Sequence, residues 1–126
     1  MPTVEIVKGN CFEIRGWVKD GECQVLDFLS ELAGNGNPEA DRLLWLIRKT
    51  AENGVSGNIR HVRSLGDEIF EFKGNDTARV LFFYDRGKLI ICSHGFAGKK
   101  GNEKKFIKDQ KAKAVVIRAA YFAERG

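Results

Sequence analysis

Histidine, cysteine and proline are scarce in this chain of 126 residues, which has two histidines, three cysteines and two prolines. Cys11, Cys23 and Cys92 form no Cys-x-x-Cys pair, and no histidine stands at the spacing of a zinc site. We therefore expect free, mostly buried thiols, with no bound metal and no cofactor. The shortage of proline excludes collagen-like and proline-rich linker proteins.

Long apolar runs are also missing. No window approaches the roughly 18 consecutive apolar residues that a membrane span requires, so we expect no membrane association. The first residues, Met1 to Glu5, lack the basic region and apolar segment of a secretory signal. These two absences favour a cytoplasmic protein, and the length predicts one domain over residues 1–126.

Positive charge is concentrated in one segment of the chain. The formal net charge is +4, from 21 Lys and Arg against 17 Asp and Glu. Residues 99–113 hold seven lysines against Glu103 and Asp109, and seven minus two gives +5 for this segment alone. A local basic field attracts polyanions such as nucleic acid. A lysine-rich helix face that only keeps the protein in solution is the alternative interpretation.

Hydrophobic periodicity predicts an α+β fold. Apolar residues at helical spacing between Val25 and Leu32 predict a helix that stops at Gly34. A second helix is expected to begin with Asn37 as N-cap and Pro38 at its first position, and to end at Asn53-Gly54. Period-two segments predict strands, and a final helix is expected from Glu103 to about Glu124. The expected strands are Thr3–Val7, Cys11–Trp17, Glu68–Lys73, Arg79–Tyr84 and Lys88–Phe96, with a loop from Val55 to Leu65.

Two expectations concern packing. Trp45 and Leu46 lie off the main apolar stripe of the second helix, and we expect both to pack in the core. One face of the later strands is expected to lie under the helices, and Tyr84 is expected to pack as well. The residues of that face are Phe70, Phe72, Phe82, Ile90 and Cys92.

The lengths of the connectors predict which strand residues pair. Five residues between the first two later strands would pair Lys73 with Arg79, and Glu71 with Leu81. Three residues in the next connector would pair Arg79 with Ser93. Lys73 and Arg79 then lie at the end of the sheet from which residues 97–101 depart, so Lys99 and Lys100 would join them. In this register His94 falls on the opposite face, where a structural role is favoured.

Two cations in central strands need an anion nearby. A phosphate backbone is the natural external candidate, because arginine offers paired donors and lysine a mobile charge. Glu71 is an internal candidate as the partner of Lys73. The alternative is that Lys73 and Arg79 merely occupy solvated strand ends.

Three sequence elements in this order resemble the RelE/ParE/HigB superfamily of bacterial toxins, and most closely its phage-derived HigB-like branch. They are Leu65–Lys73, Arg79–Tyr84 and His94–Lys100. The resemblance covers about residues 20–122. It implies a RelE-like fold, in which a curved antiparallel sheet carries an N-terminal helical hairpin and a C-terminal helix. Two departures are that Lys73 replaces the usual arginine, and that the pair Lys99-Lys100 lies one residue beyond the common spacing.

The resemblance further implies a type II toxin-antitoxin toxin, a hydrolase that cleaves messenger RNA on the ribosome and inhibits translation. Its partner would be a helix-turn-helix antitoxin. The basic positions carried over are Lys73, Arg79, Lys99 and Lys100. Two alternatives stay open: a non-catalytic binding or regulatory module of the same fold, and a ParE-like toxin directed against gyrase.

Such an endoribonuclease would use the 2′-hydroxyl of the RNA as nucleophile and leave a 2′,3′-cyclic phosphate. Arg79 is the candidate clamp for the phosphorane, and Lys73 the general base or a second clamp. Lys99 or Lys100 would contact the phosphate and assist the leaving group, and Glu71 would position Lys73 or act as base. This hypothesis requires an Arg79 guanidinium that is not buried against an internal acid. The expected RNA-binding residues of the basic segment are Lys104, Lys105 and Lys108.

Overall fold

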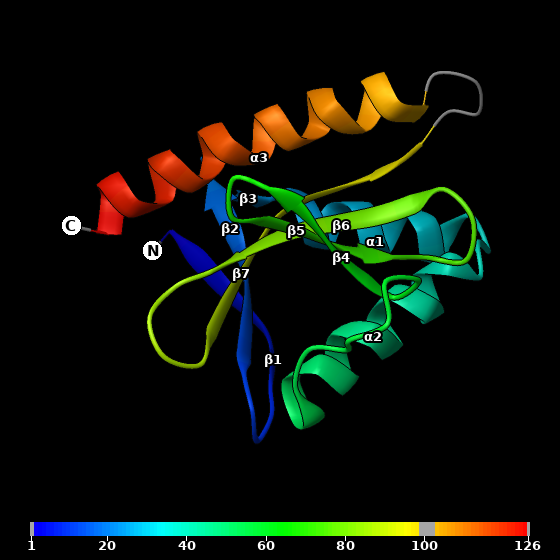
Figure 1. Ribbon diagram of the computed structural model, residues 1–126, viewed down its shortest axis with the longest axis horizontal. Coiled ribbons are helices and arrows are strands. Elements are labelled where there is room, and N and C mark those ends of the chain that lie inside the picture. Colours follow the sequence, from blue (N-terminus) through cyan, green and yellow to red (C-terminus); the bar gives the residue numbers. More distant parts are fainter. Residues whose placement is uncertain (1, 99–102, 126) are drawn as a thin grey trace.

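The structure is a computed structural model that describes residues 2–98 and 103–125 (Figure 1). In these residues the chain forms an α+β arrangement of three helices and a seven-stranded sheet. Helices α1 and α2 cover one face of the sheet, and α3 crosses the other. The elements are β1 (Thr3–Lys8), β2 (Glu13–Lys19), β3 (Glu22–Cys23), α1 (Gln24–Gly34), α2 (Glu39–Asn53), β4 (Val62–Gly66), β5 (Ile69–Lys73), β6 (Ala78–Tyr84), β7 (Leu89–Ala97) and α3 (Glu103–Arg125).

The sheet is mixed rather than purely antiparallel. Its strand order is β1-β2-β7-β6-β5-β4, and the short β3 pairs with β2 off this path. The meander β5-β6-β7 is antiparallel, as predicted. However, β2 lies parallel to β7, with Ile14 opposite Ile90. The prediction of an antiparallel sheet is therefore wrong at this one pairing. Two helices and four strands separate β2 from β7 in sequence, and this long connection allows the chain to return in the same direction.

Strand β4 occupies the end of the segment that was expected to be a loop. It pairs with β5 along the edge of the sheet, with Arg63 opposite Glu71. The turn between the two strands has positive φ at Gly66, Asp67 and Glu68. Two non-glycine residues in this region are unusual, and both side chains form ion pairs with α3, to Lys111 and Arg118.

The local signals that begin and end α2 act as the sequence predicted. The Oδ1 atom of Asn37 accepts a hydrogen bond from the backbone N–H of Glu39 at 2.9 Å. Pro38 already has a helical φ of −63°, which suits the first turn. At the other end Gly54 adopts a φ of +93°, a conformation that costs glycine little. Helix α1 ends at Gly34, also as predicted.

Two apolar cores lie on the two faces of the sheet. In the described part of the chain the core under α1 and α2 has 17 buried residues, and the core under α3 has nine. The larger core contains the predicted face of Phe72, Phe82, Ile90 and Cys92, with Phe70 and Tyr84 packed against it. The larger core therefore carries most of the apolar burial that stabilises the fold.

Close packing of α1 requires glycine at position 95 in β7. A Cβ atom there would come within 2.1 Å of the ring of Phe28. Any side chain at this position would therefore push α1 away from the sheet. The glycine of the His94-Gly95-Phe96 element thus has a packing role.

Trp45 does not pack in the core. Leu46 is buried as expected, but the side chain of Trp45 is 43% exposed. The buried stripe of α2 runs through Leu43, Leu46 and Ile47, which turns the neighbouring Trp45 outward. The expectation that both residues are core residues is therefore wrong for Trp45.

Candidate functional site

The turn between β5 and β6 sets the positions of two predicted site residues. Lys73 lies opposite Arg79, and Glu71 opposite Leu81, as the connector length predicted. The carboxylate of Glu39, which is buried at the start of α2, accepts hydrogen bonds from the backbone N–H groups of Asp76 and Ala78 at 2.7 and 3.0 Å. Glu39 thereby holds the turn that joins the two strands.

The predicted register between β6 and β7 is wrong. Arg79 lies opposite Phe96 rather than Ser93. Two features cause the difference: β7 begins only at Leu89, and the register shifts at Ser93, where a bulge inserts one residue. As a result His94 lies opposite Leu81, on the face covered by α3, and not on the face of Cys92.

A buried carboxylate joins two arginines under the N-terminal half of α3. Glu71 is 0% exposed. Its Oε2 atom accepts from Nε and Nη2 of Arg63 at 2.8 and 2.7 Å, and its Oε1 atom lies 3.2 Å from Nε of Arg79. The last contact is an ion pair without the alignment of a hydrogen bond. Glu71 is thus the internal partner of Arg63 and Arg79, whereas the sequence suggested a pairing with Lys73.

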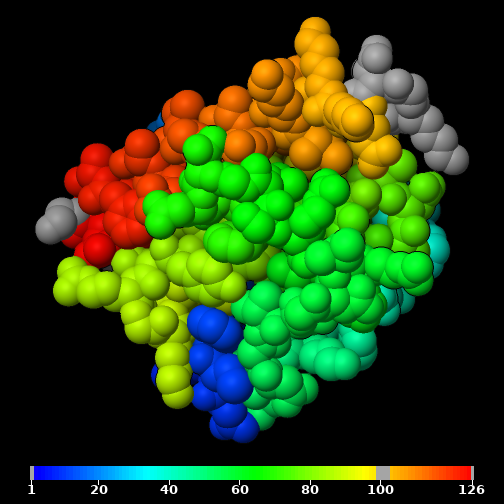
Figure 2. Space-filling model, viewed as in Figure 1, coloured from blue at the N-terminus to red at the C-terminus, as the bar shows by residue number. Residues whose placement is uncertain are grey.

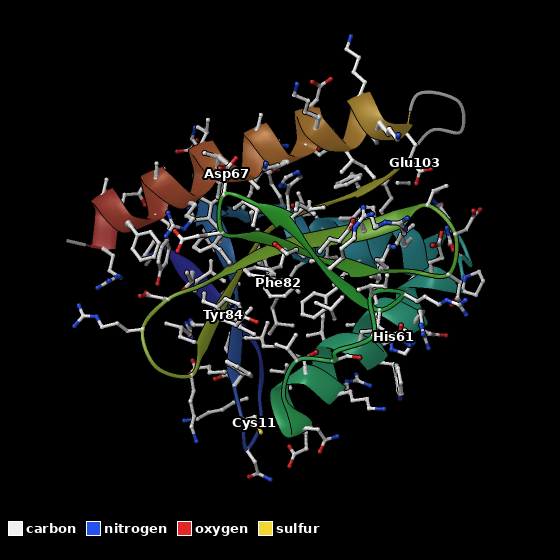
Figure 3. All side chains as sticks on the ribbon, viewed as in Figure 1. Cys11, His61, Asp67, Phe82, Tyr84 and Glu103 are labelled. Atoms are coloured by element: carbon white, nitrogen blue, oxygen red, sulfur yellow. The ribbon has the colours of Figure 1, made fainter. Side chains whose placement is uncertain are left out.

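Most of the Arg79 guanidinium is engaged within the protein. The side chain is only 8% exposed, and Nη1 donates to the carbonyl oxygens of Asp76 and Ala78, both at 3.0 Å. Nη2 lies 3.6 Å from a carboxylate oxygen of Glu103, which is 60% exposed in the first turn of α3 (Figure 3). Arg79 is therefore buried against an internal acid, Glu71, so a phosphate clamp made by the whole guanidinium is not retained. Among the described residues, only its Nη2 edge faces an exposed group.

Lys73 is more accessible than Arg79. Its half-buried side chain donates from Nζ to the carbonyl oxygen of Ile59 at 3.4 Å. Burial, and next the positive charge of Arg63, lower the pKa of Lys73, while the carboxylates of Glu71 and Glu103 act in the opposite direction. A lowered pKa increases the fraction of neutral amine at neutral pH, which is the form that accepts a proton.

His94 connects the sheet to α3. The ring is 1% exposed, with Nδ1 at 3.1 Å from the Ser93 hydroxyl and Nε2 at 2.9 Å from Oε1 of Gln110. Burial lowers its pKa to about 4, so the ring is neutral near pH 7. These contacts agree with a structural role for His94.

Of the lysines expected to act in the basic segment, Lys99 and Lys100 lie outside the described residues. The side chains of Lys104, Lys105 and Lys108 are exposed along the first turns of α3, the helix whose first residue contacts Arg79. The structure therefore brings together Glu71, Lys73 and Arg79, with these exposed lysines on the adjoining helix.

Three residues of this site were not predicted from the sequence: Glu39, Arg63 and Glu103. Arg63 belongs to the strand that was expected to be a loop, and Glu103 contacts Arg79 only because α3 packs across the sheet. Glu39 carried a visible signal as an acidic residue in a first helical turn, but that signal does not indicate its bonds to a distant turn.

A comparison with family models finds a match that covers residues 27–123. The matching model is described as "Phage derived protein Gp49-like (DUF891)". The chain belongs to this Gp49-like family. No curated protein matches it in a sequence search. All site residues named above lie within the Gp49-like region, whereas β1, β2 and β3 precede it. In the described part of the chain, no helix of this Gp49-like protein is both long and apolar enough to cross a bilayer.

Proposed function

We propose that this Gp49-like protein is the toxin of a type II toxin-antitoxin system, a RelE-fold endoribonuclease of the HigB-like branch that cleaves messenger RNA on the ribosome. The observation that carries the proposal is the half-buried Lys73, whose pKa is lowered, beside Arg63 and Arg79 at one end of the sheet. Membership of a phage-derived family of toxin-like proteins supports it. The exposed lysines at the start of α3 suit the approach of an RNA backbone.

In this proposal the neutral amine of Lys73 removes the proton from the 2′-hydroxyl of the RNA. The resulting oxygen attacks the adjacent phosphorus, the bond to the 5′-oxygen breaks, and a 2′,3′-cyclic phosphate remains. The departing 5′-oxygen receives a proton from Lys99 or Lys100. No metal ion takes part in these steps.

Arg79 contributes through the edge of its guanidinium that carries Nη2. Glu71 and two carbonyl oxygens hold the other nitrogens, so Glu71 acts as a positioning residue rather than as the base. A phosphate would replace the carboxylate of Glu103 at Nη2 and gain a donor whose orientation is already fixed. Lys104, Lys105 and Lys108 would bind the RNA backbone on either side. A helix-turn-helix antitoxin would bind this cytoplasmic toxin and silence it.

One observation favours a second function, that of a non-catalytic binding or regulatory module. A buried arginine whose charge is already matched by Glu71 and Glu103 also stabilises a fold without any substrate. A module of this kind would retain the basic surface of α3 and lack cleavage.

The test is induced expression of the wild type and of Lys73→Met, with the 5′ ends of cellular messenger RNA mapped after induction. We expect new cleavage sites within reading frames for the wild type, and a loss of cleavage of roughly 10²-fold or more for Lys73→Met. Lys88→Met, at an exposed lysine before β7, removes the same charge and should leave cleavage unchanged.

Arg79→Lys is the matching variant at the second cation, because it keeps a positive charge beside Glu71 but removes the planar group. It should reduce cleavage while the protein stays folded, which circular dichroism would confirm. DNA damage without RNA cleavage would instead indicate a gyrase-directed toxin. Growth that is unaffected by the wild-type protein would favour the binding module.

A further inference from the structure

A hollow of about 390 Å³ lies on the outer face of α2, away from the site described above. It is lined by Trp45, Arg48, Lys49 and Asn53. The indole of Trp45 is 43% exposed, although tryptophan is generally a well-buried residue. Because the core does not account for Trp45, its ring is available to a ligand.

The position of the indole is fixed by its neighbours. The Arg42 guanidinium and the Lys49 ammonium lie 4.9 and 4.6 Å from the ring centroid, and His61 meets the ring edge-on. Cations at these distances are attracted by the π-system. A ring that is exposed but held in place loses little conformational freedom when a ligand binds to it.

The four lining residues supply the contacts that one nucleotide needs. A base would stack on the indole in place of the Lys49 ammonium, and the displaced Lys49 and Arg48 would offer positive charge to a phosphate. The Asn53 amide can both donate to and accept from the edge of a base. Asp41 and Glu52 are also exposed on α2, but neither lines the hollow. The combination of one aromatic ring, two cations and one amide favours a nucleotide over a purely acidic peptide, which would use only the cations.

The hollow is joined to Lys73 by a short stretch of surface. His61, which contacts Trp45, follows Ile59 and Arg60, and Lys73 bonds to this segment through both its side chain and its backbone N–H. In Figure 2, α2 and residues 54–73 form a continuous surface below α3. In Figure 3, His61 and Glu103 lie on the same side of the view as the β5–β6 turn. A single strand of RNA that passes Lys73 can therefore continue over His61 to Trp45.

We propose that the hollow of Trp45, Arg48, Lys49 and Asn53 is a nucleotide subsite that binds one unpaired base and its phosphate in single-stranded RNA. The subsite rests on the proposed function for its choice of RNA as ligand. It extends that function by placing a base-binding contact on α2, remote from the reacting phosphate.

The experiment compares two fluorescent probes by anisotropy. One is a short 2′-O-methyl oligoribonucleotide, which cannot be cleaved because it lacks a free 2′-hydroxyl. The other has the same backbone with abasic residues throughout. We expect the wild type to bind the first probe more tightly. Trp45→Ala should weaken that binding about ten-fold and leave binding of the abasic probe unchanged, and Trp45→Phe should restore most of the loss.

Two controls separate stacking from charge and from loss of folding. Val116→Ala removes another exposed apolar side chain, on α3 and outside both the hollow and the surface that joins it to Lys73, and should have no effect on either probe. Arg48→Gln should weaken both probes and reduce the salt dependence of binding. Arg86→Gln removes an equal charge from the turn after β6 and should change neither affinity.

Two results would overturn the subsite. The first is equal binding of the base-bearing probe by the wild type and Trp45→Ala, and the second is an equal loss on both probes. If the first result is accompanied by loss of binding to a co-expressed antitoxin, Trp45 is a protein contact. Cellular RNA cleavage is scored separately. A protein that cleaves RNA but binds the base-bearing and abasic probes equally overturns the subsite alone. A protein that binds the base-bearing probe more tightly but does not cleave RNA overturns the proposed endoribonuclease alone.

Discussion

The two faces of the sheet differ in the side chains that they bury. Under α1 and α2 the buried cluster is almost wholly apolar, with the ring of Phe82 stacked on Phe72 at a centroid distance of 4.2 Å. Under α3 the apolar cluster is smaller, and polar groups accompany it. Those groups are the ion pairs of Glu71 with Arg63 and Arg79, and the contacts among Ser93, His94 and Gln110.

This difference places most of the stabilising apolar burial on one face of the sheet and most of the charged site residues on the other. Burial of apolar surface is the dominant favourable contribution to folding, and the face under α1 and α2 supplies most of it. Buried charges contribute little net stability even when they are paired. The face under α3 therefore contributes less to stability, but it holds charged groups in fixed positions. Every site residue that the structure describes, apart from the Glu39 that holds the β5–β6 turn, belongs to this second face.

Two adjacent isoleucines in β7 provide a matched test of the comparison. Ile90 is buried in the larger core and Ile91 in the smaller one, and both are fully inaccessible to solvent. We expect Ile90→Ala to lower the free energy of unfolding by about 4 kcal/mol and Ile91→Ala by about 2 kcal/mol. The reason is that a single crossing helix can settle into a cavity more easily than two helices can. Urea denaturation measures both values, and equal or reversed losses would contradict the proposed difference between the faces.

The sequence was sufficient to predict the elements whose apolar residues recur at regular spacing. Helices α1 and α2 carry apolar residues at helical spacing and clear signals at their ends. The β5–β6 register followed from a connector of fixed length, so Lys73 was correctly placed opposite Arg79. Strand β4 was missed because it lies at the edge of the sheet, where only Val62 of its five residues is buried. An edge strand of this kind has no strong apolar alternation to reveal it.

The site was predicted in part for the same reasons. The bulge at Ser93 leaves no mark in the sequence, and it alone moved His94 to the other face. Missing β4 also hid Arg63, so Glu71 was assigned to Lys73 when its partners are two arginines. The contact of Glu103 with Arg79 depends on the path of α3 across the sheet, which no local pattern specifies.

The neutral, buried His94 predicts an acid sensitivity that comes from the α3 face. Its pKa is about 4 in the folded protein, compared with the ordinary value of 6.5. Between these two values the unfolded chain binds more protons than the folded one, so stability falls as the pH drops through this window. We expect a loss of about 2 kcal/mol from this group between about pH 7 and pH 5.

His94→Gln removes the titrating ring and keeps a polar side chain beside Gln110. Urea denaturation of both proteins at each pH gives the contribution of His94 as a difference. Carboxylates elsewhere act equally in the two proteins and cancel. If the two proteins lose the same stability between the two pH values, His94 is not held neutral by the contact between β7 and α3.

The smallest effect on stability should come from Glu103, where the polar face meets solvent. Its carboxylate is 60% exposed and lies 3.6 Å from Nη2 of Arg79, and exposed ion pairs of this kind are worth about 0–1 kcal/mol. Glu103→Gln should therefore leave the free energy of unfolding nearly unchanged. It should increase affinity for the uncleavable RNA probe several-fold at low salt, because Nη2 loses its internal anion.

Glu103→Gln should also lower the pKa of Lys73 further, since the Glu103 carboxylate raises it. The rising limb of the pH–rate profile of cleavage should therefore move to lower pH. Asp109→Asn removes the same charge from an exposed position on α3 and controls for the change in net charge. An equal gain in affinity from both variants would show that Glu103 acts only through the net charge of α3 and not through its contact with Arg79. The difference between the two faces of the sheet would then not include the first turn of α3.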